Sequence, residues 1–143
     1  MESLLDQGTH LFAARLAVLD SLLKARGINA RRTCSYRSPH EQARLYLQGR
    51  STPGAIVTDA RAGKSPHNWG QPAHGTIPAL SLAADYAPLI NGVVTWEPGS
   101  AWWQAFGQAA RDSKLYWGGL FRHRPDRPHV ELPNWEHYTK GPR

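Results

Sequence analysis

Three side chains of the kind that bind metal ions stand far apart in this sequence, and any fold that joins them is tightly constrained. They are His67, Asp85 and His129. Two histidines and one carboxylate form a ligand set suited to catalytic Zn²⁺, which binds its ligands tetrahedrally and keeps its fourth position for water. Asp126, three residues before His129, would be placed to take a proton from that water. The sequence therefore favours a fold that brings residues 67, 85 and 126–129 together.

The bulk composition is that of one globular domain covering residues 1–143. The chain has 41% hydrophobic and 20% charged residues, which is ordinary for a folded protein. No apolar run approaches the roughly 20 residues that span a bilayer. The first six residues lack the basic and apolar regions of a signal peptide. We expect a monomer that is made and left in the cytosol and has no membrane span.

The charge balance favours an acidic partner. Lys and Arg number 17 against 11 Asp and Glu, which gives a formal net charge of +6. Such a surface suits nucleic acid, anionic lipid or an acidic cell-wall polymer. No helix-turn-helix, zinc-finger or RNA-binding signature is present, so nucleic acid is not expected. The densest basic groups are Arg31-Arg32 and residues 122–127, and we expect both to flank the metal site.

Cys34 is the single cysteine of the chain. It excludes an intramolecular disulfide and a zinc site built from several cysteines. Cys34 lies in an alternating apolar run, and we interpret it as a small buried hydrophobic residue.

Three helices are predicted. Residues 3–25 carry apolar side chains at helical spacing, and Gly27 marks the end of that helix. A capping box with proline at the first helical position opens a second helix over residues 38–48. A third begins near Ser100, and its buried face should carry Trp102, Phe106, Ala109 and Ala110.

Short strands alternate irregularly with these helices, which predicts an α+β fold with a small antiparallel sheet. The expected strands cover residues 28–36, 82–87, 93–96, 115–117 and 128–132. Pro88 should end the second strand. Residues 50–81 are rich in Gly, Pro, Ser and Thr and predict one long loop, of the kind that is usually functional or mobile. The last ten residues are expected to form a surface tail.

Of the seven histidines, only two have neighbours that favour a functional role. His67 lies between Ser65-Pro66 and Asn68-Trp69-Gly70, a rigid polar segment that can aim a side chain. His129 and Glu131 share one face of a predicted strand. The other candidates have ordinary surface or helix-face explanations.

Several motifs follow one another in an order that resembles one enzyme family. They are Tyr36-Arg37-Ser38 with Glu41-Gln42, Ser65-Pro66-His67-Asn68, Leu82-Ala83-Ala84-Asp85-Tyr86, Trp117-Gly118-Gly119 and Asp126-Arg127-Pro128-His129. This order resembles the VanY-like zinc peptidases, which include D-Ala-D-Ala carboxypeptidases and phage L-alanyl-D-glutamate endopeptidases. The resemblance covers roughly residues 10–132 and implies a hedgehog/DD-peptidase-like fold.

The resemblance also implies roles for individual residues. His67, Asp85 and His129 would hold Zn²⁺, and Asp126 would act as the general base. Arg37 would stabilise the oxyanion; the alternative is a structural ion pair between Arg37 and Glu41 four residues on. Ser65 and Gln42 would contact the substrate or support those that do.

Two alternatives stay open at this point. Residues 71–80 look like an insertion between His67 and Asp85, and His74 falls where an uninterrupted motif would place the carboxylate. We prefer Asp85, since a three-histidine site is chemically sound but turn residues surround His74. We expect the insertion to form a lip beside the substrate cleft. Glu131 could replace Asp126 as the base, although the Asp-x-x-His spacing favours Asp126.

The function implied by the resemblance is zinc-dependent hydrolysis of the peptidoglycan stem peptide by a phage-type endolysin. The bond between L-alanine and D-glutamate is the expected target, and the protein would act on the cell wall after release from the host cytoplasm. D-Ala-D-Ala carboxypeptidase or dipeptidase activity is the first alternative. A non-catalytic wall-binding module is the second.

Overall fold

A five-stranded antiparallel sheet forms the centre of the fold in the computed structural model, which describes residues 2–141. Its strand order is β1-β2-β5-β4, and β3 pairs with β2. The strands are β1 (Ala30–Cys34), β2 (Ala83–Ile90), β3 (Val93–Val94), β4 (Tyr116–Trp117) and β5 (His129–Glu131). The helices are α1 (Leu4–Ala25), α2 (Pro39–Leu47) and α3 (Ser100–Asp112). Three short 3₁₀ helices are η1 (Pro66–Asn68), η2 (Gly118–Leu120) and η3 (Trp135–Thr139). The predicted α+β class is confirmed.

The two faces of the sheet have different tasks because side chains alternate along each strand. Ala84 and Tyr86 of β2 and Val130 of β5 belong to the hydrophobic core on one face. Asp85 and His129 alternate with them and so lie on the opposite face. The sheet therefore separates the core from the predicted metal ligands.

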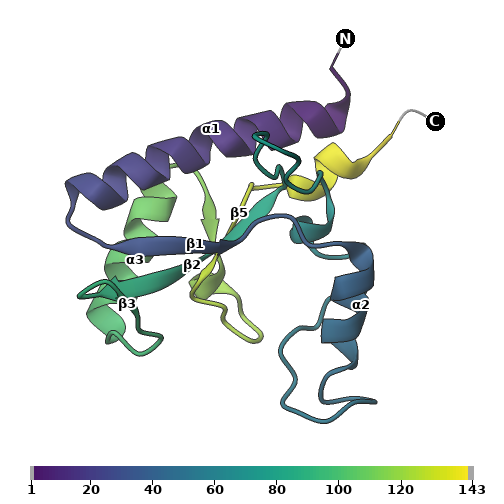
Figure 1. The fold of residues 1–143 in the computed structure, drawn as a ribbon. Helices are drawn as coiled ribbons and strands as arrows, with labels where there is room; N and C mark the ends of the chain where they lie inside the picture. The colour runs from purple at the N-terminus through teal and green to yellow at the C-terminus, as the bar shows by residue number, and fades with distance from the viewer. Residues whose placement is uncertain (1, 142–143) are drawn as a thin grey trace.

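Two helices cover the core face. α1 buries one stripe of large side chains, Phe12, Leu16, Leu19 and Leu23, and α3 buries Trp103, Phe106, Ala109 and Ala110 against the same cluster. Ser3 caps α1 by accepting a hydrogen bond from the Asp6 amide. In Figure 1, α1 runs across the top of the sheet, and α2 with the long loop projects from the opposite side.

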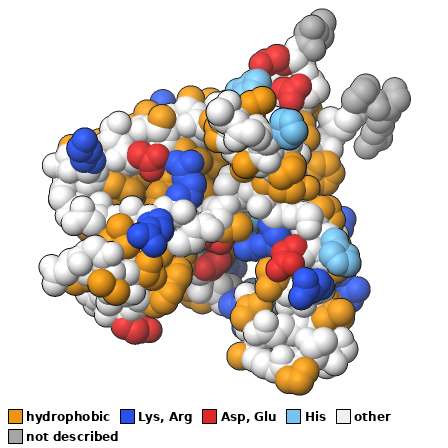
Figure 2. Space-filling model, in the orientation of Figure 1, with side chains coloured by type: hydrophobic (Ala, Val, Ile, Leu, Met, Phe, Trp, Pro, Cys, Tyr) orange, Lys and Arg blue, Asp and Glu red, His pale blue; other side chains and the backbone are white. Residues whose placement is uncertain are grey.

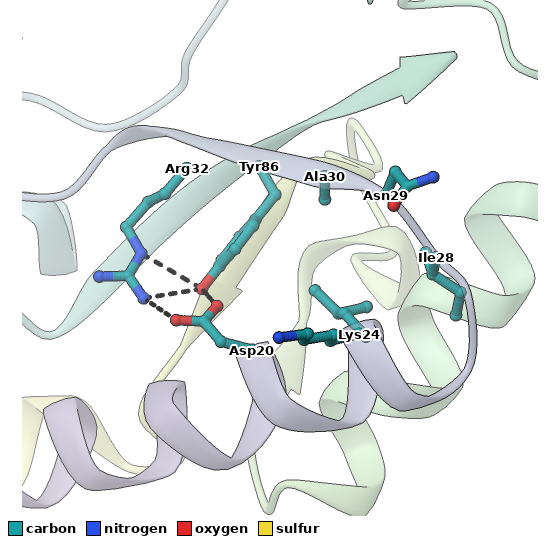
Figure 3. A pocket seen from close by; sticks show the side chains of 8 residues that line it. Asp20, Lys24, Ile28, Asn29, Ala30, Arg32 and Tyr86 are labelled. Atoms are coloured by element: carbon teal, nitrogen blue, oxygen red, sulfur yellow. Dashed lines mark hydrogen bonds and ion pairs between the residues drawn. The ribbon is translucent and has the colours of Figure 1, made fainter. Parts of the chain in front are cut away.

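A polar network behind Asp85 joins α1 to the sheet. The Tyr86 hydroxyl donates to Asp20 Oδ1 at 2.7 Å and accepts from the Arg32 guanidinium, which also donates to Asp20 Oδ2 at 2.8 Å (Figure 3). Burial and the neighbouring carboxylate raise the pKa of Tyr86, so its hydroxyl stays protonated. Arg32 therefore faces α1, and the prediction that it flanks the metal site is wrong.

Two predictions about element ends were also wrong. β2 continues through Pro88 to Ile90. The Tyr86 amide donates to the Pro128 carbonyl. The nitrogen of Pro88, two residues further along, points to the same side but lies beyond the end of β5. The N–H group that proline lacks therefore removes no hydrogen bond between these strands. The predicted surface tail contains η3, whose Trp135 and Tyr138 pack on the core cluster. Residues 142 and 143 lie outside the described part.

In α3 the predicted buried face needs one correction. Trp103 is buried, with 3% of its surface exposed, whereas Trp102 is only partly buried and packs against the edge of the core cluster. The rings of these neighbours meet edge to face at 4.9 Å, so both contribute to the packing of the helix. Among residues 2–141, the structure contains no helix with the length and apolar character needed to cross a membrane.

Candidate metal centre and catalytic cleft

Strand register brings two of the predicted ligands together. Asp85 of β2 lies directly opposite His129 of β5, so their side chains rise side by side from the same face of the sheet. Cys34 of β1 lies opposite Asp85 on the other flank. The row Cys34–Asp85–His129 thus crosses three strands. Asp85 and His129, which are 44 residues apart in the sequence, lie next to each other in the sheet.

His67 reaches the same row from η1. Ser65 caps this short helix by accepting from the His67 amide, while the Asn68 side chain returns to the Ser65 amide. This reciprocal capping fixes the segment. The Leu82 amide also donates to the Pro66 carbonyl, which ties η1 to the residue before β2. The side chain of His67 is 3% exposed, and its direction is therefore set by the surrounding backbone.

Asp85 Oδ1 lies between the two imidazoles. It is 3.3 Å from His67 Nε2 and 3.4 Å from His129 Nδ1. Ligand atoms about 2.0–2.1 Å from a tetrahedral zinc ion lie about 3.3–3.4 Å from one another. Three protein ligands of such a site have three distances between them, and two of these are present here. The third distance, between His67 and His129, is longer. Among the described residues, each set of ligand atoms that all lie within 4.8 Å of one another contains only one of the two histidines.

Each imidazole uses its remaining nitrogen to hold a fixed orientation. His67 Nδ1 donates to the Ser35 carbonyl oxygen at 2.7 Å. His129 Nε2 donates to Glu131 Oε1, also at 2.7 Å. These partners assign the tautomers that leave His67 Nε2 and His129 Nδ1 available to a cation. The donor set therefore fits zinc in its chemistry.

Cys34 borders this site, contrary to its interpretation as a buried core residue. It is partly exposed, and its Sγ lies 3.8 Å from His67 Nδ1. Cys34, His67 and Asp85 form one geometric set that could surround a cation. The Ser35 carbonyl already occupies Nδ1, however, so the available nitrogen of His67 is the one that faces Asp85. The sequence carried no signal for this position because only strand register reveals it.

The charges of the cluster depend on one another. Burial opposes ionisation of Asp85, but hydrogen bonds from His129 and His67 outweigh it and hold the Asp85 pKa well below its usual range. Burial likewise opposes protonation of His67, and contact with Asp85 and Cys34 overcomes it and raises the pKa to about 10. The carboxylate thus makes the centre strongly attractive to positive charge, whether a proton or a cation.

Asp126 lies beside the row at the mouth of the cleft. One of its carboxylate oxygens belongs to a set with Asp85 and His129 whose ligand atoms all lie within 4.8 Å of one another. Enclosure by protein raises the pKa of Asp126 above its ordinary value, although neighbouring positive groups oppose the shift. Its amide donates to the Gly118 carbonyl at 2.8 Å. A Cβ on Gly118 would lie 2.4 Å from the Asp126 carbonyl oxygen, so this turn requires glycine.

Arg37 points into the cluster. Its guanidinium lies 3.6 Å from Asp85 Oδ2 and donates to Gln42 Oε1 at 3.0 Å. Gln42 is fully buried and donates in turn to the Ala60 carbonyl. The alternative ion pair between Arg37 and Glu41 is absent, since Glu41 pairs with Arg44. Gln42 therefore positions Arg37 and lies too deep to touch a substrate.

The insertion lies away from the cluster. Residues 71–80 form a small hairpin with bridges Gln71–Leu80 and His74–Ile77, and His74 is exposed. None of these residues lines the cleft. The prediction of a lip beside the substrate is therefore wrong, and His74 is not among the residues brought to the metal centre.

An open cleft surrounds the cluster. One wall comes from residues 57–67, the other from residues 121–126, and Arg37, Asp85, His129 and Glu131 lie between them. Asp59 connects the walls, with oxygens 3.1 Å from Arg124 and 3.3 Å from Arg50. Figure 2 shows the hollow beside the projecting α2 arm, and on this face the Lys and Arg side chains are scattered rather than gathered.

Known proteins resemble this chain in sequence and in fold. No protein-family model matches it. The peptidoglycan L-alanyl-D-glutamate endopeptidase CwlK of Bacillus subtilis (strain 168) is 35% identical over 118 residues, which cover 76% of this chain and 64% of that protein. The structure of the L-Ala D-Glu endopeptidase ChiX of Serratia marcescens matches with a TM-score of 0.59 at 17% identity, covering 93% of this chain and 89% of that one.

These matches bear on the chain in different ways. The ChiX likeness shows the fold. The CwlK match confirms, in sequence, the resemblance that the motifs indicated, although the chain spans slightly less than two thirds of that relative.

Proposed function

We propose that the chain is a zinc-dependent peptidoglycan hydrolase that cuts the bond between L-alanine and D-glutamate in the stem peptide. The observation that carries this proposal is the placement of Asp85 Oδ1 at 3.3 and 3.4 Å from one nitrogen of each histidine. A carboxylate at the mouth of the cleft and an arginine adjoin the same atoms. Similarity to CwlK, whose name states this activity, supports the choice of bond.

His67, Asp85 and His129 would hold the ion through two nitrogens and one oxygen. Bound there, Zn²⁺ would supply Lewis-acid chemistry, polarising the scissile carbonyl and lowering the pKa of a water toward about 7.

The remaining steps fall to the side chains of the cleft. Asp126 takes a proton from the attacking water and passes it to the departing amine. Its raised pKa makes it a stronger base than an ordinary carboxylate. Arg37, held by Gln42, stabilises the negative charge that develops on the carbonyl oxygen. Glu131 is engaged with His129, which favours Asp126 as the base.

Digestion of purified sacculi followed by mass spectrometry of the products tests the bond. We expect new N-terminal D-glutamate on the released peptides, and glycan strands whose lactyl groups carry only L-alanine. Loss of terminal D-alanine alone would instead establish a carboxypeptidase. Binding of sacculi without any product would establish the wall-binding module.

Removal and return of the metal tests the cofactor. Treatment with a chelator should abolish turnover, and one equivalent of Zn²⁺ should restore it, with metal content measured at each step. Equal activity before and after chelation would refute the zinc mechanism. Action at the cell wall follows from the proposed substrate; a part in phage release is a further proposal, tested by lysis when expression is combined with a membrane pore.

Replacement of Asp126 separates proton transfer from metal binding. Asp126→Asn should lower kcat by about 10²–10⁴-fold, the usual contribution of a general base. Metal content should stay at the wild-type level, because the three proposed ligands remain. Wild-type turnover in Asp126→Asn would transfer the base role to Glu131.

A further inference from the structure

The cleft contains one cation whose charge no neighbour neutralises. Three Lys or Arg side chains line it: Arg37, Lys64 and Arg124. Arg37 lies beside Asp85, and Arg124 forms two contacts with Asp59 at 3.1 and 3.2 Å. Within residues 2–141, Lys64 has neither an ion pair nor a side-chain hydrogen bond. Apart from Arg37, which the proposed mechanism directs at the scissile carbonyl, the Lys64 ammonium is therefore the cleft charge that remains available to a ligand.

The backbone on both sides of Lys64 is held in place. Asn68 Oδ1 accepts from the Gly63 amide at 3.1 Å and from the Ser65 amide at 3.3 Å. The Lys64 amide donates to the Arg61 carbonyl at 2.9 Å. The backbone of Lys64 thus belongs to a fixed segment that lies only three residues before His67.

The proposed substrate carries the complementary charge. A glutamyl residue within a peptide uses one of its carboxyl groups in the chain and keeps the other as a free carboxylate. When the chain continues through the γ-carboxyl, the free α-carboxylate stands on the carbon that bears the scissile nitrogen. It must then lie close to the metal ligands during cleavage. A substrate that is not amidated at this position therefore brings a carboxylate into the cleft that Lys64 lines together with the proposed metal ligands.

We propose that Lys64 binds the free carboxylate of the glutamyl residue and makes the enzyme selective for glutamate over its amidated form. This inference rests on the proposed function and adds its specificity. A lysine exposed to water should contribute about a tenfold preference at most, which is the size of a modest charge-assisted hydrogen bond. The effect should appear in KM, because the contact is the same in the ground state and in the transition state.

Two synthetic peptides test the inference. Both contain L-Ala–D-Glu continued through the γ-carboxyl; one has a free α-carboxylate and the other an α-carboxamide. The zinc-loaded wild type should cleave the carboxylate peptide with about tenfold higher kcat/KM. Lys64→Met should remove this preference by raising KM for the carboxylate peptide alone, and Lys64→Arg should keep most of it. Arg122→Met, an exposed cation that does not line the cleft, is the matched control.

The outcomes separate the two proposals. Equal cleavage of both peptides by the wild type, or an equal loss on both in Lys64→Met, overturns the role of Lys64 and leaves the endopeptidase function intact. Failure of the wild type to cut either peptide, together with release of D-alanine from another, overturns the proposed function itself. Melting temperatures of the variants would show that the exposed substitution has not unfolded the protein.

Discussion

The two histidines of the centre are held by different kinds of partner. His67 donates to a main-chain carbonyl, that of Ser35, and His129 donates to a side chain, that of Glu131, both at 2.7 Å. The lengths are equal, yet the first contact depends on the path of the backbone and the second on the identity of one residue. No side-chain substitution can remove the Ser35 carbonyl, whereas one substitution at Glu131 removes the acceptor of His129.

The same difference runs through the surroundings of each histidine. His67 belongs to a short capped helix joined to the residue before β2, so its position is shared among many backbone contacts. His129 lies on a three-residue strand, two residues before its own partner. We infer that the His67 half is rigid and tolerant of substitution, and that the His129 half is where the properties of the metal can be adjusted. An orienting carboxylate raises the basicity of the ligand more than a neutral carbonyl does.

Asp85 joins the two halves, and its replacement should have the largest effect. Asp85→Ala removes the oxygen that faces both imidazoles, so we expect metal content and turnover to fall to background. His74→Ala should retain both, because His74 lies on the exposed hairpin away from the cleft. Metal analysis of the two purified variants measures this directly. Zinc loss from His74→Ala, with retention in Asp85→Ala, would reverse the ligand assignment.

Replacement of Glu131 and of Ser35 tests most directly whether His129 depends on a side chain and His67 on the backbone. Glu131→Ala deletes the partner of His129 and should weaken zinc affinity about 10–100-fold, the usual effect of losing such a partner. Ser35→Ala removes only a hydroxyl that contacts Ser81 and leaves the carbonyl in place. The zinc affinity of Ser35→Ala should stay within about twofold of the wild type, a much smaller change than the one expected for Glu131→Ala.

Competition titration with a chromophoric chelator gives both zinc affinities. Glu131→Gln, which keeps an acceptor without its charge, should fall between Glu131→Ala and the wild type. Equal losses in Ser35→Ala and Glu131→Ala would mean that the two halves are not held differently. Such a result would count against the distinction between backbone and side-chain support.

The amino-acid sequence revealed what depends on local spacing. The apolar positions of α1 predicted the helix within a residue of each end, and the pattern of β5 placed His129 and Glu131 on one face. The sequence therefore placed Glu131 near His129, but it suggested an alternative base and not the hydrogen-bond partner that Glu131 is in the structure. The Asp-x-x-His spacing likewise anticipated that Asp126 would lie near its histidine.

Contacts set by distant pairing could not be read from spacing. The acceptor of His67 is a carbonyl 32 residues away, and every residue has a carbonyl, so no residue type marks it. The docking of η3 on the core and the position of the 71–80 hairpin depend on tertiary packing in the same way. A bulge between Arg32 and Cys34 also shifts the register of β1, and that shift decides which residue of β1 stands beside Asp85.

Cys34 is that residue, and its replacement should have the smallest effect of the three. The thiol lies 3.8 Å from His67 Nδ1, but the Ser35 carbonyl is closer and occupies the same nitrogen. If the backbone alone supports His67, Cys34→Ser should change zinc affinity by less than about twofold, well under the loss expected for Glu131→Ala. Cobalt substitution gives an independent measurement, since a thiolate ligand produces a charge-transfer band that nitrogen and oxygen ligands do not. A band that is present in the wild type and lost in Cys34→Ser would place sulfur among the ligands and make the His67 half as dependent on a side chain as the His129 half.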